Sequence, residues 1–373
     1  MKKLLLEDCC EILDSMRIPI TASERKSGSY PYYGANGIQD YVADYIFDDE
    51  LVLLAEDGGN FGSKTKPIAY RVSGKCWVNN HAHVLKPKKD FNVDYLCYSL
   101  MFYNTDGLVN GATRQKLTQA TMRQMLIPQR AYQEQCDIVA QMNKVNLIIK
   151  TRQNQLQKLD ELVKARFVEL FGNPVINNKG WNVSDLGQLT IKIGSGATPK
   201  GGKEAYQTDG ISLIRSMNVH NGKFEYKELA HISDEQAARL ENVAVEENDV
   251  LLNITGASVA RSCVVPTNVL PARVNQHVCI IRCKDSIMPD FINSLLIDDN
   301  YQDLLWSIAG SGATREAITK QQVESLQIIL PPISKQEEFS KFINRVDKSK
   351  VAVQKSLDEA QLLFHSLMQQ YFG

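Results

Sequence analysis

Hydrophobic residues recur every seven positions along two long stretches of the chain, residues 132–171 and 335–371. Neither stretch contains an internal glycine or proline. A sustained seven-residue apolar period predicts helices that pack along a seam. We expect this seam to pack against the other helix and against a partner protein. Its positions are Met142, Ile149, Leu156, Val163 and Leu170 in the first stretch, and Phe339, Val346, Val353, Leu357 and Phe364 in the second. The alternative is a helical hairpin whose apolar residues form the core of the chain and do not contact a partner protein.

The two stretches end two copies of one larger block. The first copy opens with Gly-Ala-Thr-Arg at 111–114 and ends at Gly172; the second opens with the same four residues at 312–315 and ends at Gly373. Both ends are 201 residues apart (312 − 111 and 373 − 172). Each copy also has an apolar run ending in proline, then a Gln-Glu pair, then the long helix. This order indicates a tandem duplication.

The segments before each Gly-Ala-Thr-Arg repeat a second order of features. Each has an apolar strand, a glycine-containing loop, a strand around Asn-x-His, and a helix, predicted at 93–104 and 291–308. The loops contain Gly58 and Gly256, and the histidines are His81 and His277. We therefore predict an α+β chain of four parts: a strand-rich domain at 1–130, a helix at 131–172, a second domain at 173–334 and a helix at 335–373.

Composition excludes several classes of protein. No apolar run approaches the ~20 residues that span a bilayer, so we expect no membrane partner. Several cysteines lie in apolar strand-like or helical contexts, which indicates buried free thiols in a reducing cytoplasm. The eight cysteines form no Cys-x-x-Cys pair, and no spacing matches a closed zinc site, so we expect no metal. The net charge of −1 carries no signal for nucleic acid, and this counts against a self-sufficient DNA-binding protein.

Known catalytic patterns are also missing. The nearest approach to a phosphate-binding loop, residues 197–204, lacks the leading glycine and has Glu204 where a hydroxyl should bind magnesium. Asp209, Glu225 and Lys227 have the crude spacing of a nuclease centre, although such residues occur together by chance. The hypothesis that the chain is an enzyme acting alone on DNA therefore depends on these three residues only.

Glycine loops flanked by amides and arginines favour DNA recognition. Backbone N–H groups in such loops can approach phosphates, while Arg pairs with guanine and Asn or Gln with adenine. The candidate DNA contacts in the first half are Tyr32, Tyr33, Asn36, Asn60, Asn80, Arg114 and Lys116; those in the second half are Thr198, Lys200, Arg215, Asn218, Thr255, Ser258, Arg261, Gln276 and Arg315. His81 and His277 stand at equivalent positions, so we expect a shared structural role for them.

The doubled arrangement resembles the specificity subunit of type I restriction–modification systems. The residues that carry the resemblance are Gly312–Arg315, Leu330–Pro332 with Gln336-Glu337, the weaker first copy, the two helices, and Gly194–Pro199. The resemblance implies two target recognition domains in pseudo-two-fold arrangement, separated by two antiparallel coiled-coil helices. Each domain would read half of a bipartite, asymmetric site on double-stranded DNA.

The same resemblance implies the partners and cofactors. The chain itself would be non-catalytic and hold no cofactor. Two adenine methyltransferase subunits would bind it and use S-adenosylmethionine, and restriction/translocase subunits with ATP and Mg can join the assembly. A coiled-coil scaffold that binds protein but not DNA is the remaining alternative.

Overall fold

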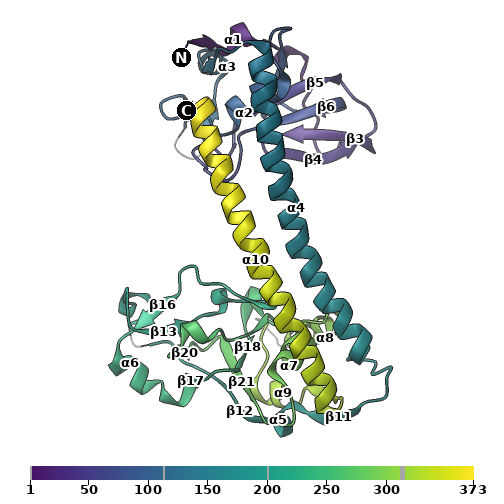
Figure 1. Ribbon diagram of the computed structural model, residues 1–373, viewed down its shortest axis with the longest axis vertical. Helices are drawn as coiled ribbons and strands as arrows, with labels where there is room; N and C mark the ends of the chain where they lie inside the picture. The colour runs from purple at the N-terminus through teal and green to yellow at the C-terminus, as the bar shows by residue number, and fades with distance from the viewer. Residues whose placement is uncertain (1, 112–113, 200, 311–315) are drawn as a thin grey trace. The chain divides into compact units, whose positions relative to one another are not determined.

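The computed structural model describes residues 2–111, 114–199, 201–310 and 316–373. The chain divides into two compact units: unit 1 comprises residues 1–153 and 355–373, and unit 2 comprises residues 154–354. Each long helix contributes one half to each unit. Figure 1 shows the elements by label. None of the described helices combines the length and apolarity that a bilayer crossing requires.

Unit 1 is built on a six-stranded sheet with the order β2-β7-β5-β6-β3-β4. Its elements are β1 (Lys3–Leu5), α1 (Leu6–Cys9), β2 (Cys10–Ile12), the 3-10 turn η1 (Asp14–Met16), β3 (Ser27–Gly34), β4 (Gly37–Val42), β5 (Phe47–Ala55), β6 (Ala69–Val78), β7 (Ala82–Pro87), α2 (Val93–Met101), β8 (Val109–Asn110), β9 (Lys116–Leu117), α3 (Gln119–Arg123), β10 (Leu126–Pro128) and the first part of α4 (Tyr132–Phe171).

Both faces of the central strand β5 are buried, which explains its uninterrupted apolar run. Val52 and Leu54 face α2, which lies on one side of the sheet (Figure 1). Leu51 and Leu53 point to the opposite core, as the two-residue period of a strand requires. The edge strand β4 differs, because Ile38 and Tyr41 on it are exposed.

Unit 2 contains two four-stranded sheets, with orders β12-β21-β18-β19 and β16-β13-β20-β17. Its elements are β11 (Asn182–Asp185), α5 (Leu186–Leu189), β12 (Thr190–Ser195), η2 (Gly202–Ala205), β13 (Ile211–Ile214), η3 (Ser216–Asn218), β14 (Val219–His220), β15 (Lys223–Phe224), β16 (Ala230–Ile232), α6 (Asp234–Arg239), η4 (Glu241–Val243), β17 (Ala244–Val245), β18 (Val250–Asn253), η5 (Gly256–Ser258), β19 (Ser262–Val264), η6 (Thr267–Val269), β20 (Ala272–Val274), β21 (Val278–Cys283), α7 (Pro289–Leu296), α8 (Asp299–Gly310), α9 (Lys320–Glu324), β22 (Gln327–Leu330) and the first part of α10 (Ile333–Phe372).

The two units repeat one strand pattern. In unit 1, β5 pairs antiparallel with β7, and β3 runs parallel to β6. In unit 2, β18 pairs antiparallel with β21, and β13 runs parallel to β20. The predicted α+β duplication is thus confirmed in the fold of each unit. The pseudo-two-fold relation between the units stays a prediction.

Within each unit the two long helices run antiparallel. In unit 1, Gln141 accepts a hydrogen bond from Tyr371 at 2.8 Å, and Arg152 donates to Ser356 at 3.0 Å. In unit 2, Asp160 pairs with Lys350 at 2.6 Å. Each helix has 40 residues, so the continuous helices predicted from the seven-residue period are confirmed.

Two predicted elements differ from the structure. The helix expected at 291–308 is interrupted: α7 ends at Leu296, and Asp298 accepts hydrogen bonds from the backbone of Asn300 and Tyr301, which starts α8 as a new helix. The strand expected around Asn79 is two strands, because Asn79–His81 forms the turn between β6 and β7. There Asn79 accepts a hydrogen bond from the His81 backbone at 2.8 Å.

Candidate nucleic-acid interface

The loop after β5 is the organising feature of the unit 1 surface. Gly58 has φ of +61°, a backbone conformation that favours glycine, and its N–H donates to Gln115 O at 3.1 Å. Asn36 donates to the Gly58 carbonyl at 3.0 Å, and Asn60 donates to the Asn36 side chain at 3.0 Å. The structure therefore brings together Asn36, Asn60 and the segment that follows Arg114.

Beside this loop, the Asp57 carboxylate contacts the side chains of both Arg114 and His81. Asp57 Oδ1 lies 2.7 Å from Arg114 Nη2 and 2.7 Å from His81 Nδ1. The Arg114 side chain remains 60% exposed, so it can contact a ligand while Asp57 limits its rotation. The carboxylate is 18% exposed and is therefore held by the fold more firmly than the guanidinium. We call Asp57, His81 and Arg114 the unit 1 triad.

Next to the unit 1 triad, Glu56 contacts two basic residues, Lys116 and Arg17. Lys116 Nζ is 3.0 Å from Glu56 Oε1, and Arg17 Nη1 is 2.6 Å from Glu56 Oε2. Burial raises the pKa of the Glu56 carboxyl, but the hydrogen bonds from Arg17 and Lys116 and the charge of His83 outweigh burial and lower it. Lys116 is half exposed, so its ammonium can reach a phosphate from this fixed base.

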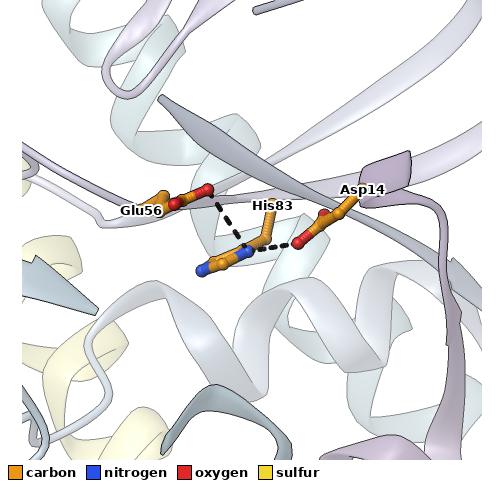
Figure 2. A group of neighbouring side chains, drawn as sticks. All are labelled: Asp14, Glu56 and His83. Carbon is orange, nitrogen blue, oxygen red and sulfur yellow. Dashed lines mark hydrogen bonds and ion pairs between the residues drawn. The ribbon is translucent and has the colours of Figure 1, made fainter. Parts of the chain in front are cut away.

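One group of potential metal ligands exists among the described residues, formed by Asp14, Glu56 and His83 (Figure 2). Side chains of the protein already engage its carboxylates: Arg17 and Lys116 contact Glu56, and the His83 ring bonds Asp14 at 2.6 Å. The second ring nitrogen of His83 lies 2.9 Å from Leu117 O. The ligand atoms are thus engaged by the protein itself, and the expected absence of a metal stays a prediction.

Unit 2 places an uncharged group at the equivalent loop. Gly256 has φ of +72°, and its N–H donates to Glu316 O at 2.9 Å, as Gly58 does in unit 1. The Thr255 hydroxyl bonds His277 Nδ1, and Gln276 Nε2 lies 3.1 Å from His277 Nε2. Thr198 bonds the Gln276 side chain. Three sequence-predicted contacts, Thr198, Thr255 and Gln276, therefore meet around His277.

Burial removes two of the predicted DNA contacts from the surface. Asn218 is fully buried, and its amide bonds the carbonyls of Glu225 and Lys227, so it stabilises the turn after η3. Tyr32 is 1% exposed, and its hydroxyl donates to Ile20 O at 3.3 Å. Direct contact with DNA would require these segments to unfold. We do not retain either side chain as a proposed contact.

The remaining predicted contacts are not gathered in one group. Tyr33 is half-buried against Tyr70, Arg215 is half-buried over the Tyr206 ring, and Asn80 is exposed. Ser258 and Arg261 are half-buried on and after η5. Lys200 and Arg315 lie outside the described residues. DNA contact by these side chains stays a prediction.

The helix seam also differs from the expectation of a partner surface. Six of the predicted positions are at most 9% exposed: Met142, Leu170, Phe339, Val346, Leu357 and Phe364. Met142 and Phe364 pack in the core of unit 1, and Leu170 and Phe339 pack in the core of unit 2. The other four predicted positions are half-buried: Ile149, Leu156, Val163 and Val353. The seven-residue pattern therefore marks the helix pair itself. The exposed large hydrophobic residues on the two long helices are Tyr132, Leu147, Ile148, Leu162 and Val168 on α4, and Ile333, Val351, Leu362 and Leu363 on α10.

Sequence reasoning missed the residues that hold the candidate contacts in place. Asp57 was not singled out, and neither were Asp14, Arg17 or Glu56. The available signal was the acidic pair before Gly58 together with the duplicated His81. Asp14 and His83 are 69 residues apart, and no periodic pattern predicts their contact.

Relatives match over most of the chain. A protein assigned as a type I restriction enzyme specificity subunit of Haemophilus influenzae is 25% identical over 353 residues, which covers 92% of this chain and 86% of that protein. One of Methanocaldococcus jannaschii is 21% identical and covers 71% of this chain and 64% of its own length.

Solved structures share the fold. The S subunit of a type I restriction–modification system from M. genitalium aligns with a TM-score of 0.61 and 11% identity, over 100% of this chain and 96% of that one. A chain from a study of type I R-M assembly aligns with a TM-score of 0.54 and 16% identity, over 100% and 97%.

The sequence model of the type I restriction modification DNA specificity domain matches residues 1–160 and again residues 178–361. These matches fall on the two halves that repeat the same strand order and the same glycine loop. The chain therefore belongs to the family of type I restriction–modification DNA specificity subunits.

Proposed function

We propose that the chain is the non-catalytic subunit that selects the DNA sequence for a type I restriction–modification complex. Unit 1 reads one half of a bipartite site and unit 2 reads the other. One observation carries this proposal: the same loop framework occurs twice with different chemistry. At the matched positions of the two loops, Asp57 pairs with Lys116 beside Gly58, whereas Thr255 pairs with Ala317 beside Gly256. Two similar frameworks with unlike side chains suit two unlike half-sites.

Partner subunits complete the proposed complex. With a net charge of −1, the chain has too little positive charge to neutralise many phosphates by itself. We propose that two methyltransferase subunits bind the exposed faces of α4 and α10 and supply further phosphate contacts. S-adenosylmethionine then belongs to those subunits, and ATP and Mg belong to restriction subunits where these are present.

The two alternatives have less support. Among the described residues, Glu225 accepts a hydrogen bond from the Lys227 backbone at 3.2 Å, and no contact joins Asp209 to either residue. The hypothesis of a scaffold that binds protein but not DNA does not explain why Arg114 and Lys116 are exposed beside a glycine loop.

Adenine methylation across a host genome tests the proposal. The chain is co-expressed with its methyltransferase subunit, and methylated adenines are mapped by long-read sequencing. We expect methylation at one split motif with two short halves. Exchange of residues 1–110 for those of another family member should change one half and leave the other intact. Methylation that ignores this exchange, or a complex that binds duplexes without preference, refutes the specificity role.

A further inference from the structure

A buried ionic group distinguishes unit 1 from unit 2. Asp14 follows β2, Glu56 follows β5 and His83 lies in β7, and both carboxylates face Nδ1 of the same imidazole (Figure 2). The Asp14 distance is 2.6 Å and the Glu56 distance is 3.7 Å. The His83 side chain is 1% exposed and that of Asp14 is 5% exposed.

The partners of His83 fix the number of protons on its ring. A carbonyl oxygen only accepts hydrogen bonds, so Nε2, 2.9 Å from Leu117 O, must carry a proton. Asp14 accepts from the Val84 N–H at 2.9 Å and from Gln119 at 3.1 Å, an arrangement that suits an ionised carboxylate. Nδ1 must therefore carry a proton too, which makes His83 an imidazolium ion.

Electrostatics in the pocket agree with this assignment. Burial raises the pKa of Asp14, but hydrogen bonds from His83 and Val84, with the charges of His83 and Arg17, outweigh burial and lower it. The charged groups that face the imidazole are Asp14 and Arg17 from the η1 region and Glu56 from the end of β5, with Lys116 beyond Glu56 at the rim. Arg17 contacts both carboxylates, at 3.5 Å from Asp14 and 2.6 Å from Glu56, and Lys116 contacts Glu56 at 3.0 Å, so the 2.6 Å contact with Asp14 is the observation that assigns the second proton to His83.

Unit 2 shows that the fold does not require this charge. The backbone registers match: Leu117 N donates to Glu56 O at 2.7 Å in unit 1, and Ile318 N donates to Ile254 O at 2.8 Å in unit 2. Likewise His83 pairs with Leu54 on β5, and Cys279 pairs with Leu252 on β18. Glu56 and His83 thus correspond to Ile254 and Cys279, and Asp14 corresponds to Ser195, which pairs with Cys279. Of these three residues of unit 2, Ile254 and Cys279 are buried, Ser195 is exposed, and none is an acidic or basic residue.

Glu56 and His83 bond the backbone of the short strand β9, which carries Lys116. Leu117 is fixed at both backbone groups, since its N–H bonds Glu56 and its carbonyl bonds His83. Lys116 precedes Leu117 in β9 and bonds Glu56, and residue 115 bonds Gly58. We propose that His83, as a doubly protonated imidazolium, is a positioning residue that sets Lys116 and Arg114 for the DNA half-site read by unit 1, a device that unit 2 lacks. This inference rests on the proposed function.

Proton count provides a test that is independent of DNA. In chain labelled with ¹⁵N-histidine, long-range ¹⁵N–¹H spectra at neutral pH should show both ring nitrogens of His83 protonated. The His83→Gln variant identifies its signals among the six histidines. A neutral tautomer, with one unprotonated nitrogen, overturns the proposal whatever the DNA results are.

The positioning role is tested in the complex with the methyltransferase. Duplexes carry either half-site intact and the other scrambled, with sequences taken from the methylation map. The variant Asp14→Ser/Glu56→Ile/His83→Cys gives unit 1 the residues of unit 2. We expect at least about tenfold loss of preference for the half-site of unit 1, comparable to one good base contact, and no change for the other half-site.

The comparison of the two half-sites separates positioning from general stability, because a general loss of stability would weaken the preference for both half-sites. Unchanged preference in the variant, or equal loss at both half-sites, refutes the positioning role. A wild-type complex without preference for either half-site refutes the proposed function itself, and the ¹⁵N spectrum then still decides the proton count.

Discussion

Phe339 joins the second unit to its helix pair, and its truncation gives a quantitative test of that packing. It is fully buried on α10 and touches Phe167 and Phe171 on α4, with ring centroids 5.6 and 5.4 Å apart. Phe291 on α7 completes the cluster through Phe171 at 4.8 Å. One side chain thus connects both long helices with the core of the recognition domain.

Phe339→Ala should lower the free energy of unfolding of unit 2 by about 4–5 kcal/mol. Removing a buried Phe costs about 3–5 kcal/mol through lost burial and the cavity left behind. Two edge-on ring pairs add about 0.5–1.5 kcal/mol each beyond burial, so the upper part of that range applies. With a urea m-value of roughly 2–3 kcal/mol/M, the unfolding midpoint should fall by about 1.3–2.5 M.

Tryptophan fluorescence during urea unfolding measures this change in unit 2 alone. Trp181 donates to Phe171 O at 2.9 Å and so reports on the cluster, and Trp77→Phe removes the tryptophan of unit 1. The matched control is Val351→Ala on the same helix, which is 71% exposed and should change stability by less than about 0.5 kcal/mol. A loss below about 1 kcal/mol for Phe339→Ala, or one equal to the control, would refute the packing argument.

Four further predictions concern the loops and the buried charges. Asp57→Asn removes the charge that holds Arg114, so competition binding should show about tenfold weaker discrimination of the half-site of unit 1. Lys116→Ala should reduce the slope of log K against log salt by about one, and an unchanged slope excludes a phosphate contact. Gly256→Ala forces a Cβ into φ of +72° and should cost unit 2 about 1–3 kcal/mol in chemical unfolding. Because folding lowers the pKa of Asp14, its stabilisation is complete above the unfolded value near about pH 4 and disappears as the pH falls through the folded value. Calorimetry should therefore show a shallower acid dependence for Asp14→Asn than for the wild type.

The sequence alone predicted the duplication and both long helices. Their signals are local or periodic: a seven-residue apolar repeat, proline before each helix, glycine after it, and equal spacing between copies. The family resemblance rested on the same repeated residues. The exact extents of α7 and α8 escaped prediction, because the break depends on a capping carboxylate at Asp298.

Tertiary structure decided which polar residues are available for contact. The pattern of residues did not distinguish exposed Asn36 from buried Asn218, because both stand beside turns and only packing decides which amide faces solvent. It also gave no reason to join Asp14 to His83, since contacts across 69 residues depend on strand order and register. The sequence predicted that the seam residues lie on helices. The structure shows that most of these residues are buried, so the side of each helix that is open to a partner is the opposite, exposed one.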